Sequence, residues 1–219
     1  MGWSPESAAQ AYTETVKLCK VGIGRRHVAA GAEHHSTEFL AALAGGIEAK
    51  LLVQVTRAAT PATIALAVAA RKTGGRLICV LSESESLLNA MVAMDALGLS
   101  TVVEFIVGDA KDVLPQFSGV DFALIDCRRE ESVELFDLLR LNPSRAVVVA
   151  ENLFQRSARA LYEDKMTNRP GSKSVILPIG KGIEVAKLSR EDFGTKEEGK
   201  RRTTKRVSWA MDIADMLQR

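Results

Sequence analysis

Five short apolar runs, separated by segments with helical spacing, constrain the fold of this chain more than any other feature. The runs lie at residues 51–55, 77–81, 102–107, 122–125 and 146–150. Runs this continuous are typical of strands that are buried on both faces of a sheet. Segments 62–72, 87–97 and 131–139 between them carry apolar residues at helical spacing. The alternation predicts an α/β fold with a doubly wound, mostly parallel sheet.

The two flanks of this region add elements of a different kind. Ser4-Pro5-Glu6 offers a hydroxyl N-cap, a proline at the first helical position and an acid in the first turn, so we expect a helix to about Cys19. A loop over 21–34 and a helix capped by Ser36 and ended by Gly45-Gly46 should follow. A further helix is expected at 157–165. The last strands, 174–178 and 183–188, flank Ile-Gly-Lys-Gly, which predicts a closing antiparallel hairpin.

We therefore expect one domain over residues 1–190, with a core at 36–190 behind an N-terminal helix and loop at 1–35. The tail, 191–219, differs in composition: residues 196–206 hold six basic residues. Trp209, Ile213 and Met216 would share one face of a terminal helix. The favoured interpretation is a helix that docks on the body or on a dimer mate. Nuclear targeting by the basic run, or phosphorylation near Thr204 or Ser208, are the alternatives.

Composition excludes several classes of protein. A net charge of +2 in 219 residues argues against a dedicated nucleic-acid surface. The three cysteines form no CxxC pair, which favours a reducing compartment, and Cys79 lies in an apolar run as a small buried hydrophobe. No apolar run approaches the roughly 20 residues that span a bilayer, and the N-terminus lacks the pattern of a signal peptide. We expect a cytoplasmic globular protein with no membrane contact.

Polar residues end two of the apolar runs. Asp126 follows the run at 122–125, and Glu151-Asn152 follows the run at 146–150. The carboxyl ends of neighbouring parallel strands converge on one crevice, where open α/β sheets bind ligands. The sequence therefore predicts a site at this edge of the sheet.

Four segments in order carry a resemblance to a known family. They read GLSTVVEFIVGDAKDVLP, FALIDC, VVVAENLF and LPIGKGIEVAKL. Together they resemble the cation-dependent O-methyltransferases of the catechol and caffeoyl-CoA type, over roughly residues 36–188. The whole chain, with its WSPESAAQAY opening, resembles still more closely a plant family described as methyltransferase-like. The resemblance implies a Rossmann-like, seven-stranded fold, S-adenosylmethionine as cofactor, a small hydroxylated substrate and a homodimer.

The resemblance also implies a divalent cation, held by Asp126, Glu151 and Asn152. Oxygen ligands suit a hard ion such as Mg²⁺, but Glu151 stands where the family has the shorter aspartate, and Mg²⁺ tolerates misplaced ligands poorly. The alternative is that these are ordinary strand-end residues, with Asn152 capping the next helix. The lysine that serves the family as general base is replaced by Arg129, whose guanidinium cannot accept a proton. Arg129 could orient an anionic substrate or pair with a neighbouring glutamate.

The expected cofactor turn departs from the family. After the first strand, related enzymes carry an acidic residue and then a glycine-rich turn, whereas this chain has Gln54, then Thr56 and Thr60 at the glycine positions. Side chains there would crowd a ligand that must lie against the main chain. Thr56 and Thr60 remain the matching cofactor-binding candidates. With Arg57, a threonine-rich turn before a helix would also suit an anion such as a phosphate.

Two acids are the remaining cofactor candidates. The family's ribose-binding acid falls at Leu81, and Glu83, two residues later, is the nearest substitute. The favoured alternative for Glu83 is an N-cap region with an acidic first turn. Asp109 matches the loop that approaches the adenine, although an aspartate that starts a short helix is common. His34-His35 could supply a base, but adjacent histidines in a loop are more often solvated.

Three functions stay open from the sequence. The first is an S-adenosylmethionine-dependent O-methyltransferase in which Asp126 and Arg129 act at the substrate. The second is a catalytically degenerate methyltransferase fold that serves as a binding or regulatory module. The third is a protein that binds a small molecule or anion at the turn of residues 56–61. Fold alone does not decide among them.

Overall fold

The structure is a computed structural model that describes residues 2–20, 34–126, 132–153 and 173–188. Its helices are α1 (Pro5–Lys20), α3 (His34–Gly46), α4 (Pro61–Thr73), α5 (Leu87–Ala96), α6 (Ala110–Val113) and α7 (Ser132–Leu138). Its strands are β1 (Leu51–Thr56), β2 (Arg76–Leu81), β3 (Val103–Val107), β4 (Ser118–Val120), β5 (Phe122–Asp126), β6 (Arg140–Leu141), β7 (Ala146–Glu151), β8 (Lys173–Leu177) and β9 (Ile183–Leu188). Short 3-10 turns are η1 (Ser84–Ser86), η2 (Ser100–Val102) and η3 (Leu114–Gln116).

A seven-stranded sheet organises the fold, in the order β3-β2-β1-β5-β7-β9-β8. The pairs from β3 to β7 are parallel, and β9 pairs antiparallel with both β7 and β8. The predicted doubly wound sheet with a closing antiparallel hairpin is therefore confirmed. Strand order reverses between β1 and β5, which makes this pair the switch point of the sheet.

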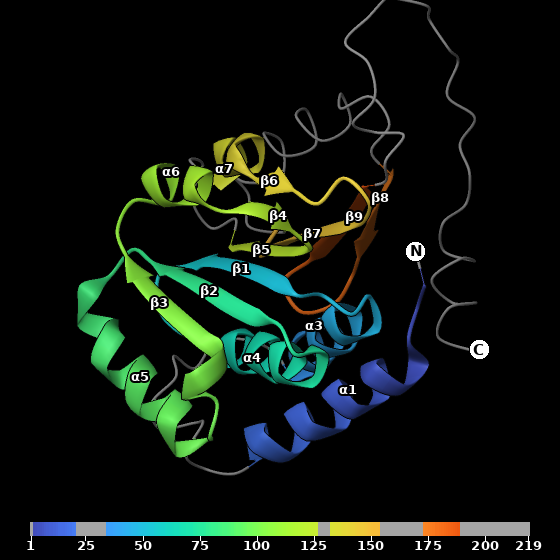
Figure 1. The fold of residues 1–219 in the computed structure, drawn as a ribbon, viewed down its shortest axis with the longest axis horizontal. Helices are drawn as coiled ribbons and strands as arrows, with labels where there is room; N and C mark the ends of the chain where they lie inside the picture. Colours follow the sequence, from blue (N-terminus) through green and yellow to red (C-terminus); the bar gives the residue numbers. More distant parts are fainter. Residues whose placement is uncertain (1, 21–33, 127–131, 154–172, 189–219) are drawn as a thin grey trace, which may run out of the picture.

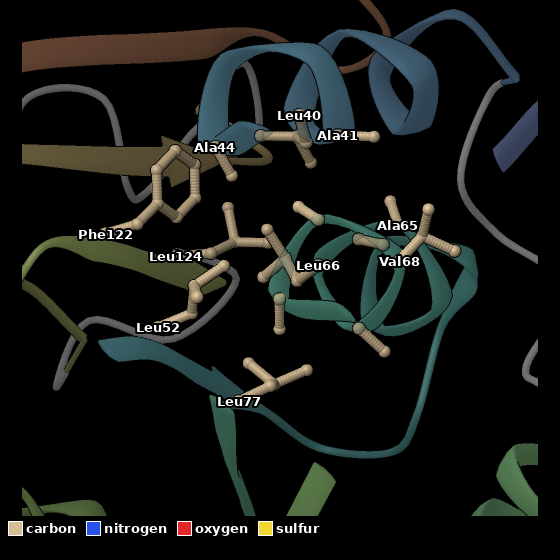
Figure 2. Packing of buried hydrophobic residues seen from close by; sticks show 14 of the residues in the cluster. Leu40, Ala41, Ala44, Leu52, Ala65, Leu66, Val68, Leu77, Phe122 and Leu124 are labelled. Atoms are coloured by element: carbon tan, nitrogen blue, oxygen red, sulfur yellow. The ribbon is translucent and has the colours of Figure 1, made fainter. Parts of the chain in front are cut away.

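Helices cover both faces of the sheet (Figure 1). On one face, α1, α3 and α4 form a layer whose buried residues join those of β1, β2 and β5, and α5 contributes Ala93 and Met94 to the same core. Leu40 of α3 and Leu66 of α4 meet Leu52 and Leu124 of the sheet in this core (Figure 2). On the other face, α6 and α7 pack over a second cluster that includes Val53, Ile125 and Val148. The two clusters confirm burial on both faces for the runs that form β1, β2, β5 and β7. The run at 102–107 differs from the prediction, because β3 lies at the edge of the sheet and its residues are partly buried or exposed.

Helix α4 illustrates how the local sequence sets an element. Pro61 occupies its first turn, and the Thr63 hydroxyl accepts a hydrogen bond from the Thr60 backbone N–H at 3.0 Å. Gly74 ends the helix in the left-handed conformation, at φ 65°, which a residue without a Cβ adopts without strain. The small residues from Ala62 to Ala70 are fully buried, so this helix lies close against the sheet.

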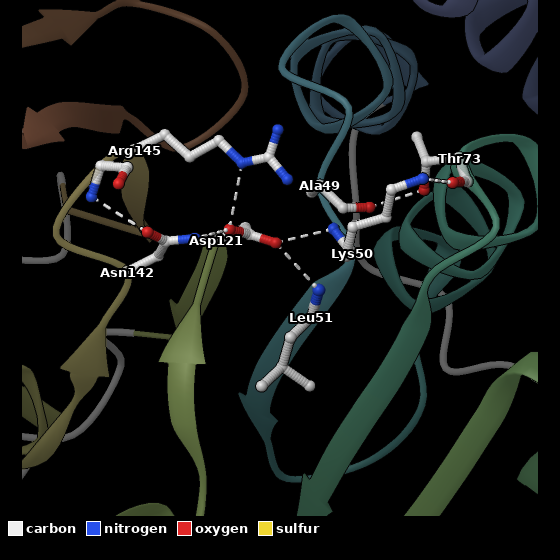
Figure 3. A network of polar contacts seen from close by, with 8 residues as sticks. Ala49, Lys50, Leu51, Thr73, Asp121, Asn142 and Arg145 are labelled. Atoms are coloured by element: carbon white, nitrogen blue, oxygen red, sulfur yellow. Dashed lines mark hydrogen bonds and ion pairs between the residues drawn. The ribbon is translucent and has the colours of Figure 1, made fainter. Parts of the chain in front are cut away.

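Asp121 ties several segments together at the N-terminal edge of the sheet (Figure 3). One carboxylate oxygen accepts hydrogen bonds from the backbone N–H groups of Lys50 (2.8 Å) and Leu51 (3.2 Å). The other accepts from Asn142 Nδ2 (2.7 Å) and Arg145 Nε (3.3 Å). Because Asp121 is buried, this network fixes the start of β1 against the segment that leads into β7.

Some boundaries differ from the sequence-based expectations. Helix α3 begins at His34, so Ser36 lies inside it and is not its N-cap. Val102 belongs to η2, and β3 starts one residue later than predicted. The pair β4 and β6 forms a separate two-stranded parallel sheet that the apolar pattern did not reveal. The predicted loop at 21–34 extended one residue too far, because His34 begins α3. The rest of that loop, the predicted helix at 157–165 and the tail at 191–219 lie outside the described residues.

Candidate functional site

The candidate site lies at the carboxyl ends of the parallel strands. At the switch point, Val55 of β1 is in register with Ile125 of β5, so the strand-ending residues Thr56 and Asp126 follow side by side. Asp126 is in register with Glu151 on β7. The sheet thus brings three of the predicted site residues to one edge, where α/β folds bind ligands.

Asp126 and Asn152 are in direct contact. Asn152 Nδ2 donates a hydrogen bond of 2.9 Å to Asp126 Oδ1, and Asp126 is buried. Asn152 has a positive φ of 65°, a conformation that asparagine tolerates better than most residues but that still carries strain. This backbone geometry turns Asn152 from the end of β7 back toward β5. The predicted convergence of Asp126, Glu151 and Asn152 is therefore present in the structure.

The side chains of Asp126, Glu151 and Asn152 offer the kind of ligand atom that a hard cation binds, but they include only two carboxylates. Two carboxylates and one amide oxygen are oxygen ligands, as Mg²⁺ requires. Among the residues that the structure describes, no group of three or more His, Cys, Asp and Glu side chains is placed to hold a metal ion. The Asn152 amide presents its N–H to Asp126, so its oxygen would have to turn to join a ligand set.

The turn between β1 and α4 forms hydrogen bonds within itself. The Thr56 hydroxyl donates to the carbonyl of Ala58 at 3.0 Å, and Thr56 is buried. The Thr60 backbone N–H is held by Thr63. The Thr56 hydroxyl therefore stabilises this turn, whereas the Thr60 hydroxyl is buried and has no hydrogen-bond partner among the described residues.

Gln54 lies beneath this turn, fully buried on β1. Its Oε1 lies 3.7 Å from Cys79 Sγ, a weak contact, and its Nε2 has no hydrogen-bond partner among the described residues. Burial raises the pKa of the Cys79 thiol to about 12, an effect that the nearby Thr63 hydroxyl offsets only in part. Cys79 is therefore a neutral, buried group, as the sequence indicated, and is no nucleophile.

Arg57 and Glu83 form an ion pair across the tips of β1 and β2. Arg57 Nε and Nη2 both donate to Glu83 Oε1, at 2.9 and 2.7 Å, and both side chains are about half exposed. Glu83 occupies the N-cap position of η1, as the favoured interpretation had it, but its side chain makes no capping hydrogen bond. The sequence alone does not reveal this pair, because the two residues are 26 positions apart. Only the adjacency of β1 and β2 brings them together.

Of the other predicted site residues, Asp109, His34 and His35 lie within the described residues and Arg129 does not. Asp109 caps α6, since its Oδ1 accepts a hydrogen bond of 2.8 Å from the Lys111 backbone N–H, and its side chain is exposed. His34 and His35 form the start of α3. Arg129, the candidate at the base position, lies outside the described residues.

Solved structures place the fold in a class. The chain superposes on cofactor-bound Rv0187 from MTB with a TM-score of 0.66 and 23% identity, over 85% of this chain and 91% of that one. An O-methyltransferase from Bacillus cereus in complex with SAH gives 0.66 and 16%, over 81% and 91%. TomG from Streptomyces achromogenes, in complex with SAM, gives 0.64 and 17%, over 86% and 92%. The fold is the Rossmann-like α/β fold of O-methyltransferases.

Sequence comparison then gives the family. The family model described as protein of unknown function (DUF1442) matches residues 1–215, and the chain belongs to this family. A catechol O-methyltransferase from Mycobacterium tuberculosis (strain ATCC 25618 / H37Rv) is 31% identical over 121 residues, which is 54% of each protein. The chain thus matches about half the length of that relative. Within the described residues, no helix has the length and apolar character needed to cross a membrane.

Proposed function

We propose that this protein is an S-adenosylmethionine-dependent O-methyltransferase that acts on a small hydroxylated molecule. The observation that carries the proposal is the contact of Asp126 with Asn152 at the switch point. A buried carboxylate held by a neighbour in a strained left-handed conformation is typical of a functional site. The bound SAM and SAH of similar folds, and the 31% identity to a catechol O-methyltransferase, support the same reaction class.

Each candidate residue has a role in this proposal. Thr56 and Thr60 would line the cofactor along the turn into α4, and Asp109 would approach its adenine. Glu83 would serve the ribose hydroxyls, since Arg57 occupies only its Oε1 and Oε2 accepts no hydrogen bond from the described residues. Asp126 would face the acceptor hydroxyl, because it ends the strand next to the cofactor turn.

A divalent cation fits the same corner by donor chemistry. Asp126, Glu151 and the Asn152 oxygen would hold it, and it would supply Lewis acidity that lowers the pKa of the acceptor hydroxyl. Such help matters here because Arg129 stands at the base position and cannot take a proton. We therefore expect acceptors with two adjacent hydroxyls, which can chelate a cation, to be preferred.

A second candidate is a methyltransferase fold that only binds. The buried amide of Gln54 replaces an acid, Thr56 and Thr60 stand at the glycine positions of the turn, and Leu81 stands where the family has its ribose-binding acid. These departures favour a regulatory or partner-binding module over a catalyst. The candidates differ in whether a methyl group leaves the cofactor.

Transfer of a labelled methyl group from S-adenosylmethionine to catechol-type acceptors, with Mg²⁺ or with EDTA, tests the proposal. We expect a methylated diol with Mg²⁺ and a loss of at least about tenfold in Asp126→Asn, since removal of a positioned catalytic group typically costs that much or more. Asp95→Asn is the matched control, because Asp95 is exposed near the end of α5. Cofactor binding without transfer to any diol, catechol or hydroxycinnamoyl ester would favour the binding module.

A further inference from the structure

Helix α5 presents an apolar face to solvent. Of the six large apolar side chains exposed among the described residues, Leu88, Met91 and Val92 lie on this one helix, with exposed fractions of 70, 52 and 45%. Their i, i+3, i+4 spacing gives one continuous stripe, while Ala90, Ala93 and Met94 on the opposite side are buried. Single exposed apolar residues need no explanation, but a contiguous patch marks an interaction surface.

The chain segment that carries this stripe is acidic, and the basic Arg71 of α4 contacts it only beyond the end of α5, where it donates a hydrogen bond to the Gly98 carbonyl. Residues 82–107 contain Glu83, Glu85, Asp95 and Glu104 and no lysine, arginine or histidine. All four acids are exposed, and Glu83 alone has a basic partner, Arg57, among the ion pairs of the described residues. Glu85 precedes Leu88 by three residues and Asp95 follows Met91 by four, so acids flank both ends of the stripe. The surface fits an occupant with an apolar face and positive charge.

The chain itself holds a segment of this chemistry. In residues 207–219, Trp209, Ile213 and Met216 would fall on one face of a helix, and residues 199–206 before it contain five basic residues and no acid. The family model extends through residue 215, so most of this segment belongs to what the family shares. The apolar spacing of residues 207–219 matches the stripe. The positive charge that matches the acids lies in residues 200–206, because residues 207–219 themselves contain Asp212 and Asp215.

The connection is long enough. Strand β9, which ends at Leu188, lies five strands from β3, a distance of about 24 Å at the usual strand spacing. The 18 residues 189–206 span up to about 60 Å when extended. Leu188 pairs with Ala146, the first residue of β7, and so lies at the amino-terminal edge of the sheet. The C-terminal end of α5 leads to β3 at the same edge, with α5 at the far end of the sheet from β8 (Figure 1).

We propose that residues 207–219 dock on the Leu88–Met91–Val92 face of α5 of the same chain, guided by the basic residues 200–206. Docking would cover the apolar stripe and pair the basic run with the acidic surface between η1 and β3. The proposal stands apart from methyl transfer, because α5 lies outside the corner formed by Asp126 and Asn152.

Hydrogen–deuterium exchange on the full chain, read by mass spectrometry, tests this. We expect protected amides in 207–219, with exchange about tenfold faster in Met91→Glu, the change that loss of one buried apolar side chain produces. Trp209→Ala should also speed the exchange of the backbone amides of α5 around Leu88, Met91 and Val92. Met91 is exposed without the tail, so the variant keeps its fold, and the amides of α4 serve as an internal reference.

Tyr12→Glu is the matched control, since Tyr12 is a comparably exposed apolar residue on α1. It should leave 207–219 unchanged, and the protection should not vary with protein concentration. Free exchange of 207–219 in the unaltered chain would overturn the proposal, as would protection that Met91→Glu does not affect. Protection that vanishes on dilution would assign the face to a second copy and equally overturn docking within one chain.

Discussion

Replacing Asp121 tests which carboxylate holds the scaffold and which belongs to the site. Its buried side chain accepts four hydrogen bonds, from Lys50, Leu51, Asn142 and Arg145. Two of the donors are the backbone N–H groups of Lys50 and Leu51 at the start of β1. After removal of the carboxylate these groups would have lost their hydrogen-bond acceptor, which costs free energy. Asp121 directly precedes β5, whereas Asp126 is the last residue of that strand and belongs to the candidate site.

The magnitude follows from these contacts. A hydrogen bond to a charged group contributes about 1.5–3 kcal/mol, but bonds that share one carboxylate do not add. Truncating one member of a buried charged network costs about 3–5 kcal/mol. Arg145 is about one-third exposed and can return to water, so we expect the lower part of that range, about 3 kcal/mol, for Asp121→Ala. Asp121→Asn keeps one acceptor oxygen and should cost about 2 kcal/mol.

Urea unfolding followed by far-ultraviolet circular dichroism measures this free energy by linear extrapolation. Glu104→Ala, on an exposed position of β3, is the control and should change stability by no more than about 0.5 kcal/mol. Folded Asp121→Asn should retain the cofactor affinity of the unaltered chain. A cost below about 1 kcal/mol for Asp121→Ala would refute the reasoning that this network fastens β1 to the sheet.

Three further predictions concern single groups. Burial raises the pKa of Glu14, but its ion pair with Lys72 and neighbouring charge outweigh this and hold the pKa below 4.5. Glu14→Gln should therefore be destabilising at neutral pH, and its difference from the unaltered chain in urea titrations should shrink as pH falls through that lowered pKa. Cys79, with a pKa raised to about 12, should resist iodoacetamide at pH 8 in the folded protein and react only after denaturation, as peptide mapping would show; rapid native alkylation would contradict its burial. Gly46→Ala would place a Cβ against the ring of Trp3, so it should lower the free energy of unfolding by about 1–3 kcal/mol, and an unchanged urea midpoint would show that Trp3 does not pack there.

The sequence predicted the sheet because burial on both faces leaves a strong signal. Runs such as residues 146–150 fit a strand that is buried on both faces, and the Ile-Gly-Lys-Gly turn indicated the antiparallel end. The short strands β4 and β6 left no such signal, since Ser118–Val120 and Arg140–Leu141 are too short and too polar to stand out. Helix starts were less certain than strands: Ser36 had cap chemistry but lies in the third position of α3.

The site was predictable in position and less so in contacts. Strand ends alone placed Asp126 beside Glu151 and Asn152, because parallel strands end at a common edge. Asparagine tolerates a positive φ better than most residues, but its presence alone does not show that Asn152 adopts this conformation or that its side chain contacts Asp126. The Arg57–Glu83 pair depends on the order of strands in the sheet. Asp121 resembles any acid before a strand, so its network could not be foreseen.

Titration of the full chain with S-adenosylhomocysteine by isothermal calorimetry, with and without Mg²⁺, tests the central claim most directly. The product of methyl transfer occupies the cofactor site without reacting, so the measurement does not depend on the choice of acceptor. We expect one molecule bound per chain with a dissociation constant on the order of micromolar, equivalent to a binding free energy of about −8 kcal/mol. Asp126→Asn should keep most of this affinity. Absence of binding at millimolar S-adenosylhomocysteine would contradict the claim that this crevice holds a methyltransferase cofactor.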